Sequence, residues 1–464
     1  MERLKRISRH IAASNVSEEG KRKARVNATG QSPVQAVIVD GARTPFVKSF
    51  GAIMKNNAIS LGAAAVKGLV AKTKIDPNAI DQLIMGNVVV NSNAPNLARE
   101  IIIDLMLPSN IPGTTVSIAC LSGLEAIYQG ICQVEHGDAS VVVAGGSDSL
   151  SSGQMSLPGN LTLALGKYSM GGGNKKGLYA GLSELFKIAG PVSGWLPKAP
   201  AIAERSTGRT MGYHADLMAE INAINRKDQD AFAIGSHSKA SKARAAIRSE
   251  VVPVKNAEGK IVNDDNLIRS KINPAKVAKL KPAFRKPQDH GTVNAASSSA
   301  LTDGASAVLI MSEAKAKELG YPTDVICKAY VKTAVEPYPQ LLLAPAVAIP
   351  KCLEKAGLSL DDIDIFEIHE AFAAQVLATL KVLESKEFAR AFLGRDTPVG
   401  SVPLEKVNLN GGSIAIGHPF AATGGRLVTT AANLLRKTGK RYALLSICAA
   451  GGIGGVMILE RREN

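Results

Sequence analysis

The sequence predicts an α/β protein made of two similar α/β halves, with a mainly helical insert in the first half. Three observations predict this fold class. Short β-branched apolar runs alternate with helical apolar patterns, as in sheets that are covered by helices. The pattern of the first half recurs in the second. Between them, residues 156–287 lose the apolar strand pattern and gain Gly and Lys.

Composition describes a basic globular protein. The 464 residues are 45% hydrophobic, with a formal net charge of +15. This charge favours a polyanionic partner, such as a phosphate-bearing cofactor or an anionic membrane. Aromatic residues make up only 4%, too few for the stacking platforms of single-strand nucleic-acid binding, so no nucleic-acid partner is expected. No apolar run reaches the length of a membrane span.

Residues 1–32 form a basic N-terminal segment that differs from the rest. Leu4, Ile7 and Ile11 share one helical face, with Arg and Lys around the other. Two interpretations stay open, a mitochondrial targeting segment and a disordered basic tail. Three glutamates count against targeting, because such peptides are poor in acidic residues.

The first half is assigned to residues 33–155 and 288–315. Strands are expected at 34–40, 80–90, 139–146 and 292–311, and helices at 58–72 and 94–105. Apolar strands of this length are typical of sheets buried on both faces.

Residues 117–130 are interpreted as a strand, a tight turn and a helix. Leu124, Ile127 and Ile131 recur at three- and four-residue steps, as on a buried helix face. Cys120 lies at the turn, beside the free N–H groups of a helix start, which favours the nucleophilic thiolate. Burial without reactivity is the more usual state of a free Cys, so this stretch alone leaves both alternatives open.

Within the insert, residues 156–287, the segment Lys176–Ile188 gathers leucines and a phenylalanine on one face. One interpretation is a helix packed on the core. The other is a surface helix, within 176–198, that contacts a membrane or a partner.

The second half, residues 316–464, repeats features of the first. Residues 75–81 resemble 358–364, at an offset of 283. Ser122-Gly123 pairs with Thr423-Gly424 at an offset of 301, and Ala144-Gly-Gly146 with Ala450-Gly-Gly452 at 306. Two copies of one α/β unit explain these recurrences.

Four residues at strand ends or Gly-rich turns carry the candidate chemistry: Cys120, His369, His418 and Cys448. Structural zinc sites contain closely spaced ligand pairs, which these are not, so no metal is expected. Nucleophilic catalysis fits better, with a Cys activated by a nearby His and a second group moving the proton. The Gly-rich loops around residues 410–413 and 450–455 expose backbone N–H groups that suit an oxyanion hole. The five cysteines, scattered and without C-x-x-C, indicate neither a disulfide framework nor a zinc site.

These residues stand in motifs that resemble the thiolase family. The matching segments cover nearly everything from residue 34 to 460: GARTPF (41–46), CLSGLEAI (120–127), AGGSDS (144–149), MGYHADLMA (211–219), RKDQDAFAIGSHSKA (226–240), GTVNAASSSALTDGASAV (291–308), HEAFA (369–373), NGGSIAIGHPFAATGGR (410–426) and CAAGGIGG (448–455). The His of HEAFA, where most thiolases have Asn, resembles the β subunit of the fatty-acid-oxidation trifunctional complex. The resemblance implies an α-β-α-β-α layered core.

The resemblance also implies roles. Cys120 would attack the 3-keto carbon of a 3-oxoacyl-CoA, and Cys448 would protonate the departing enolate and then deprotonate CoA. His418 would activate Cys120 and, with His369 acting through water, polarise the thioester oxygen. The N–H groups of Cys120 and Ala450 would form a second oxyanion hole.

Met211 and Ser299 match positions that line the acyl and pantetheine pocket. Coenzyme A would be a co-substrate, with no permanently bound cofactor.

Three positions depart from the family pattern. Ala421 stands where Gly is usual, and would be strained if the site needs a positive φ. Asn294 and Ser297 differ from the common motif before the second catalytic half. We expect activity to be retained and the acyl-chain preference to move.

The resemblance further implies acyl-CoA and CoA as ligands, a homodimer or dimer of dimers, and a hydratase/dehydrogenase α subunit as partner. A eukaryotic protein would lie in the mitochondrial matrix or on the inner-membrane surface, and a bacterial one in the cytoplasm. Alternatives are an acetoacetyl-CoA thiolase that condenses, a decarboxylating ketoacyl synthase, and a non-catalytic lipid-carrier or structural subunit. Cys448 speaks against the synthase, which needs no second thiol.

Overall fold

The structure is a computed structural model that describes residues 34–170, 187, 195–197 and 202–463. The basic segment 1–32 and most of 176–198 lie outside these described residues. Among the described residues, no helix has both the length and the apolar character needed to cross a membrane.

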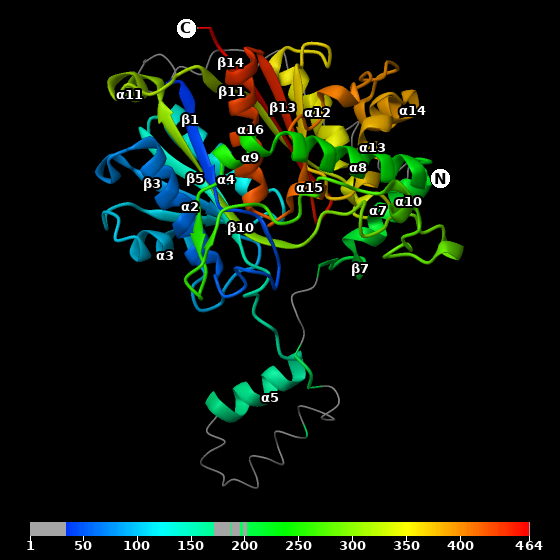
Figure 1. Cartoon of the computed structure of the whole chain (residues 1–464), viewed down its shortest axis with the longest axis horizontal. Coiled ribbons are helices and arrows are strands. Elements are labelled where there is room, and N and C mark those ends of the chain that lie inside the picture. The colour runs from blue at the N-terminus through cyan, green and yellow to red at the C-terminus, as the bar shows by residue number, and fades with distance from the viewer. Residues whose placement is uncertain (1–33, 171–186, 188–194, 198–201, 464) are drawn as a thin grey trace.

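Two sheets that share a four-strand order form the body, and the first sheet has two additional strands, β4 and β2 (Figure 1). The first has the strand order β1-β10-β5-β3-β4, with the short β2 paired to β10, and the second has the order β11-β14-β13-β12. The strands are β1 (Ala36–Arg43), β2 (Val47–Lys48), β3 (Gln82–Gly86), β4 (Gly113–Val116), β5 (Val141–Asp148), β10 (Thr302–Ser312), β11 (Val325–Ala334), β12 (Ile365–Ile368), β13 (Tyr442–Ala449) and β14 (Ile453–Arg461).

Helices and sheets alternate in five layers. On the outer side of the first sheet lie α2 (Ala58–Thr73) and α3 (Leu97–Asp104), while α12 (Ala344–Ala356) packs on the second. Between the sheets α4 (Ser122–His136) contacts α16 (Ala422–Thr438). Three separate apolar cores fill the spaces between these layers, and the central core contains residues from both sheets. The α-β-α-β-α arrangement is confirmed.

Further helices complete the two halves. Helix α11 (Glu313–Glu318) contacts β1 and β10 of the first sheet. The second half also contains α13 (Ala373–Leu383), α14 (Lys386–Phe388) and α15 (Ser413–Ile416).

The duplication is visible in the strand register. Leu83 pairs with Val143 between β3 and β5, and Phe366 pairs with Leu444 between β12 and β13. These positions differ by the offsets of 283 and 301 found in the sequence. An Asp stands just before the first strand of each pair, and its carboxylate accepts from backbone N–H groups at the start of the second strand. Asp81 accepts from the N–H groups of residues 140 and 141, and Asp364 from those of 441 and 442.

The third sequence pairing, at an offset of 306, is wrong. Ala144 lies inside β5 and pairs with Val308, whereas residues 450–452 make the turn between β13 and β14. The glycines of the two segments serve different needs. Gly146 allows the close approach of the Ala421 carbonyl, while Gly451 and Gly452 adopt positive φ angles of 81° and 70° in the turn.

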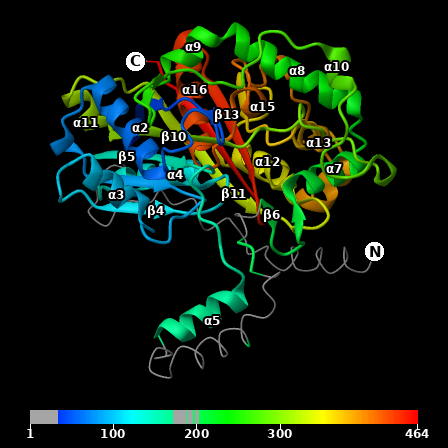
Figure 2. The same ribbon diagram turned by 60° about the horizontal axis from the view of Figure 1, so that its bottom comes forward.

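The insert is helical where it is described, with two short hairpins. Its elements are α5 (Gly159–Met170), β6 (Ala203–Glu204), β7 (Arg209–Thr210), α7 (Met211–Ile221), α8 (Arg226–Lys242), α9 (Arg244–Ser249), β8 (Val254–Lys255), β9 (Ile261–Val262) and α10 (Pro274–Ala278). Helices α7 and α8 pack on the second half, and α8 contacts α15. Figures 1 and 2 show α5 apart from the layered body.

Among the expected strands, 139–146 corresponds to β5, but only the last part of 292–311 is a strand. Residues 292–301 instead form an irregular segment that runs past the catalytic loops and makes isolated bridges to Phe372 and His418. The Ser-rich composition of this segment suits turns more than an extended strand.

We predict that Gly123→Ala destabilises the protein by about 3 kcal/mol or more. A Cβ at Gly123 would lie 1.9 Å from the carbonyl oxygen of Ala421, so the backbone of α4 or α16 would have to move. Gly235→Ala is the matched control, because nothing lies within 4 Å of its Cβ position in α8; it should stabilise by about 0.5–1 kcal/mol. Denaturant unfolding of both variants measures this, and equal stabilities would refute the constraint.

Candidate active site

Cys120 lies in the turn that joins β4 to α4. Ser122 shapes this turn, because its hydroxyl accepts from the Ile118 N–H at 2.8 Å and donates to the Ala119 carbonyl at 2.6 Å. Ala119 adopts a φ of 45°, which a side chain rarely takes. The turn therefore holds Cys120 in a defined position just before the first turn of α4.

His418 reaches Cys120 from the second half. Its Nε2 lies 3.2 Å from the Cys120 Sγ, and its Nδ1 lies 2.7 Å from the Thr423 hydroxyl. The His418 N–H donates to the Ala300 carbonyl, which ties the loop to the segment before β10. Thr423 thus orients the ring while leaving Nε2 for the thiol.

His369 follows β12 directly, and its ring lies tilted against that of His418, with ring centroids 4.0 Å apart and an angle of 38° between the planes. Its N–H donates to the Ser446 carbonyl of β13 at 2.8 Å. Its Nδ1 lies 2.8 Å from the Ser413 hydroxyl, and its Nε2 is buried without a hydrogen-bond partner among the described residues.

Cys448 and Ala450 complete the site from β13 and the turn after it. The Cys448 side chain is buried, and the neighbouring Cys120 thiol adds to the raised pKa of Cys448. The backbone N–H groups of Cys120 and Ala450 face the Cys120 sulfur and lower the pKa of this thiol. Glu204 accepts from the Gly451 N–H at 2.8 Å and so holds the turn that presents Ala450.

Burial keeps the two thiols, Cys120 and Cys448, and the two imidazoles, His369 and His418, in their neutral forms. It raises the pKa of Cys120 to about 12, with a further contribution from the Asp148 carboxylate. Burial, with the charge of Arg426, lowers the pKa of His418 to about 3, and the pKa of His369 falls well below its usual value. The thiolate expected from the helix start is therefore not the resting form, because loss of solvation outweighs the two backbone donors.

Comparisons with known proteins identify the family of the chain. The family model "Thiolase, N-terminal domain" matches residues 36–314, and "Thiolase, C-terminal domain" matches residues 322–461. The chain belongs to the thiolase family.

Three similar proteins place this thiolase more closely. The mitochondrial trifunctional enzyme subunit beta of Bos taurus is 43% identical over 91% of this chain and 88% of its own length. The 3-ketoacyl-CoA thiolase of Yersinia pestis (strain Pestoides F) is 41% identical over 91% of this chain and 96% of its own length. The crystal structure of human mitochondrial 3-ketoacyl-CoA thiolase in complex with CoA has a TM-score of 0.76 and 27% identity, and covers 93% of this chain and 98% of that one.

Ser299 lies next to the catalytic loops of this thiolase. Its N–H and its hydroxyl both donate to the Ala371 carbonyl, at 3.0 and 3.1 Å. Asn294, one of the departures from the family pattern, braces the same segment, because its Oδ1 accepts from the Ala296 and Ser297 N–H groups. The unusual residues therefore support the backbone that carries Ser299.

Met211 begins α7 and packs, partly buried, against the core cluster that contains Phe372 and Cys448. This position is compatible with a lining role. Ala421 has φ −62° and ψ −30°, so a methyl group there causes no backbone strain.

Asp148 is a buried carboxylate near the site that the sequence analysis did not single out. Buried at the end of β5, it accepts from the Val88, Val89 and Ala421 N–H groups and from the Asn87 amide. Burial raises its pKa to about 7. An Asp at the end of a buried apolar strand was the available signal, since such a carboxylate needs several donors.

The ligand atoms of Cys120, His369 and His418 lie within 4.8 Å of one another, close enough to hold a metal ion.

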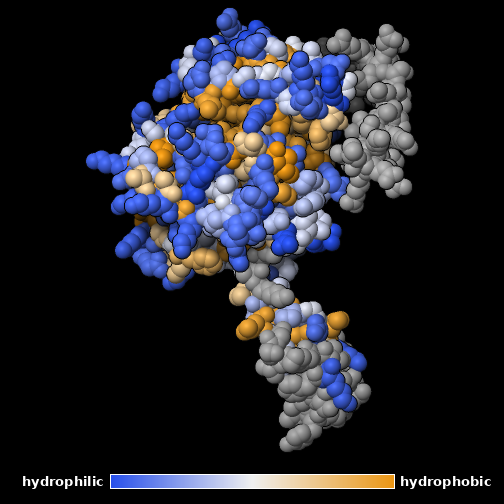
Figure 3. Space-filling view, turned by 90° about the vertical axis from the view of Figure 1, so that its right-hand side faces the viewer, coloured by the Kyte–Doolittle hydropathy of each residue, from blue (hydrophilic) through white to orange (hydrophobic). Residues whose placement is uncertain are grey.

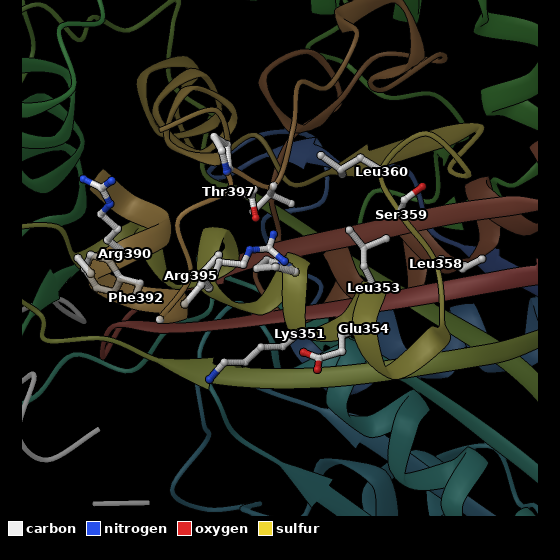
Figure 4. A pocket seen from close by; sticks show the side chains of 16 residues that line it. Lys351, Leu353, Glu354, Leu358, Ser359, Leu360, Arg390, Phe392, Arg395 and Thr397 are labelled. Carbon is white, nitrogen blue, oxygen red and sulfur yellow. The ribbon is translucent and has the colours of Figure 1, made fainter. Parts of the chain in front are cut away.

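A separate hollow of 960 Å³ lies on the outer side of the second half, between α12 and residues 390–399 (Figure 4). None of the four candidate catalytic residues lines it.

We predict that iodoacetamide modifies Cys120 ahead of Cys132 and Cys352, because His418 Nε2, 3.2 Å from the Cys120 sulfur, can take the thiol proton as the sulfur attacks. With a pKa of about 12, the thiolate fraction should rise about tenfold per pH unit between about pH 7 and pH 10. Peptide mapping after timed labelling gives the rate at each cysteine. A plateau near neutral pH, or faster labelling of Cys132, would contradict this description.

Proposed function

We propose that the protein is a 3-oxoacyl-CoA thiolase of fatty-acid β-oxidation, which cleaves 3-oxoacyl-CoA with CoA to acetyl-CoA and a shortened acyl-CoA. The observation that carries the proposal is the contact between Cys120 and His418 at 3.2 Å, with a second thiol, Cys448, beside it. Relatives named 3-ketoacyl-CoA thiolase and trifunctional enzyme subunit beta support the same assignment.

In the first half-reaction, the Cys120 thiol transfers its proton to the Nε2 of His418 as the sulfur attacks the 3-keto carbon. The N–H groups of Cys120 and Ala450 face the sulfur and are close to the oxyanion that forms. The C2–C3 bond then breaks, and its electron pair remains on C2 as an enolate. Cys448 protonates C2, which releases acetyl-CoA and leaves the acyl group on Cys120.

In the second half-reaction, the Cys448 thiolate takes the thiol proton of CoA. The CoA sulfur attacks the acyl-Cys120 thioester, and the Cys120 sulfur leaves and recovers its proton from His418. All four groups return to their neutral forms. This cycle suits a buried site, because each charge exists only while a partner carries the opposite one.

The enolate oxygen needs a donor of its own. The rings of His369 and protonated His418 lie against each other, and the buried Nε2 of His369 has no hydrogen-bond partner within the described chain. We assign both imidazoles to this oxygen. Carbon–carbon cleavage between two carbonyl groups depends on such stabilisation of the carbanion.

The experiment that tests the function is thiolysis of a series of 3-oxoacyl-CoAs, from acetoacetyl-CoA to 3-oxohexadecanoyl-CoA. We expect activity on the medium and long chains. Cys120→Ala should abolish turnover, and Cys448→Ala should lower it by about 10²–10⁴ while still allowing slow acylation of Cys120, seen by mass spectrometry. Activity confined to acetoacetyl-CoA would favour the condensing alternative, and no activity with either substrate class would favour the non-catalytic subunit.

A second proposal concerns partners and location. The printed name of the bovine relative makes it a β subunit, which supports an α subunit as partner of this chain. Relatives that are mitochondrial and bacterial support a mitochondrial location in a eukaryote and a cytoplasmic one in a bacterium. The proposal also includes assembly of this chain into a homodimer or a dimer of dimers.

Membrane contact through the insert has support in the described residues. Leu163 and Leu165 of α5 are 70% and 40% exposed, and Met155 before the helix is 60% exposed. The protruding arm that carries α5 shows apolar surface in Figure 3. Exposed apolar side chains on an arm of a basic protein favour an anionic lipid surface.

We therefore expect the full chain to sediment with anionic vesicles and much less with neutral ones. Deleting 176–198 should weaken this binding several-fold, and so should a Leu163→Ser/Leu165→Ser variant. Thiolysis of a short 3-oxoacyl-CoA by the same variants is the control for folding. Unchanged sedimentation of both variants would remove the insert from the proposal.

A further inference from the structure

Ser413 and Arg426 form a buried chain of hydrogen bonds behind His369. Arg426 donates from Nη2 to the Ser413 hydroxyl at 3.3 Å, and this hydroxyl lies 2.8 Å from the His369 Nδ1. All three side chains are at most 1% exposed. On its other side Arg426 faces Glu367, with an Nη1–Oε2 distance of 3.3 Å.

The direction of these hydrogen bonds follows from Arg426. A guanidinium has only donors, so the Ser413 oxygen accepts from it. The hydroxyl hydrogen then has one other neighbour among the described residues, the His369 Nδ1. Nδ1 is therefore the acceptor, and a neutral imidazole that accepts at Nδ1 carries its hydrogen at Nε2.

The opposite holds at His418. The backbone N–H groups of Cys120 and Ala450 face the Cys120 sulfur, so the thiol hydrogen has to point to an acceptor elsewhere. The His418 Nε2, at 3.2 Å, is that acceptor. Its hydrogen then lies on Nδ1, which donates to the Thr423 hydroxyl at 2.7 Å.

We propose that the two adjacent imidazoles hold opposite tautomers, set by Ser413 with Arg426 for His369 and by Thr423 for His418. His369 is a hydrogen-bond donor at Nε2 throughout the reaction, and His418 is an acceptor until it takes the Cys120 proton. After that transfer both rings present Nε2–H to the same oxygen. Ser413 and Arg426 are positioning residues, and this catalytic use of the tautomers rests on the proposed function.

The proposal also explains two other observations. A protonated Nε2 in His369 cannot bind a metal ion. The cluster of Cys120, His369 and His418 is therefore a thiol with one hydrogen-bond donor, His369, and one acceptor, His418, beside it. The same Nε2, buried and unpartnered, is a donor that substrate oxygen would satisfy.

Nitrogen-15 NMR of the full-length protein, labelled in its histidine rings, tests the proposal directly. Protonated and unprotonated ring nitrogens give well-separated signals, and the chain has only seven histidines. His369→Asn and His418→Asn assign the two rings by loss of their signals. At neutral pH we expect His369 protonated at Nε2 and His418 at Nδ1. The same tautomer in both rings, or His369 protonated at Nδ1, would overturn the proposal, whether or not the protein cleaves 3-oxoacyl-CoA.

Ser413→Ala and Thr423→Val form a matched pair, since each removes one hydroxyl beside one ring. Ser413→Ala should give His369 averaged ring signals, leave His418 unchanged and lower kcat on the order of tenfold with little change in KM. Thr423→Val should change the His418 signals and leave His369 unchanged. Unaltered His369 signals in Ser413→Ala would overturn the role of Ser413. If that variant does not fold, the wild-type spectrum still decides the tautomers.

Discussion

The close contact between α4 and α16 is the constraint on which the site depends. The Ala421 carbonyl lies against Gly123 and Gly146, and Gly424 lies against the backbone of Leu124. Only residues without a side chain permit helices from different halves to approach so closely. Because Cys120 precedes α4 and His418 precedes α16, this approach brings the thiol and the imidazole to hydrogen-bond distance. The catalytic contact is thus a consequence of packing at the centre of the fold.

The two halves share their backbone and differ in chemistry. At the positions equivalent to Cys448 and His369 the first half has Ser147 and Gly86. Ser147 donates to the Ala58 carbonyl at 2.7 Å, and Gly86 packs against the backbone of Ser122. Both serve structure alone. The duplicated fold supplies strand ends at two equivalent places, and the second copy carries most of the reactive groups.

Much of this could be predicted from the sequence, and the limits have physical causes. Cys120, His369, His418 and Cys448 stand out because reactive side chains at strand ends and Gly-rich turns form a pattern along the chain. The repeat was correctly aligned at offsets of 283 and 301. The alignment failed at the offset of 306, because the two segments have similar sequences but use their glycines differently. In one copy the glycine permits close packing, and in the other it permits a left-handed turn.

The protonation states could not be predicted from the sequence at all. The helix start at Cys120 favours a thiolate, but the balance between burial and donors depends on how the second half covers the turn. Ser413 and Arg426 resemble ordinary loop and helix residues until the fold places them behind His369. Hydrogen-bond direction is a property of such three-dimensional neighbours, so it appears only with the structure.

A neutral site has to be kept next to a buried charge. Arg426 faces Glu367, while Glu250 lies between Arg43 of β1 and Thr430 of α16. Removing one member of a buried ion pair costs about 3–5 kcal/mol, so these charges fix the positions of β1, β12, α16 and the segment after α9 relative to one another. Arg426 can then supply a donor to Ser413, and its positive charge also helps to keep both histidines neutral by lowering their pKa. The buried ion pairs thereby connect the stability of the fold to the tautomer that the reaction requires.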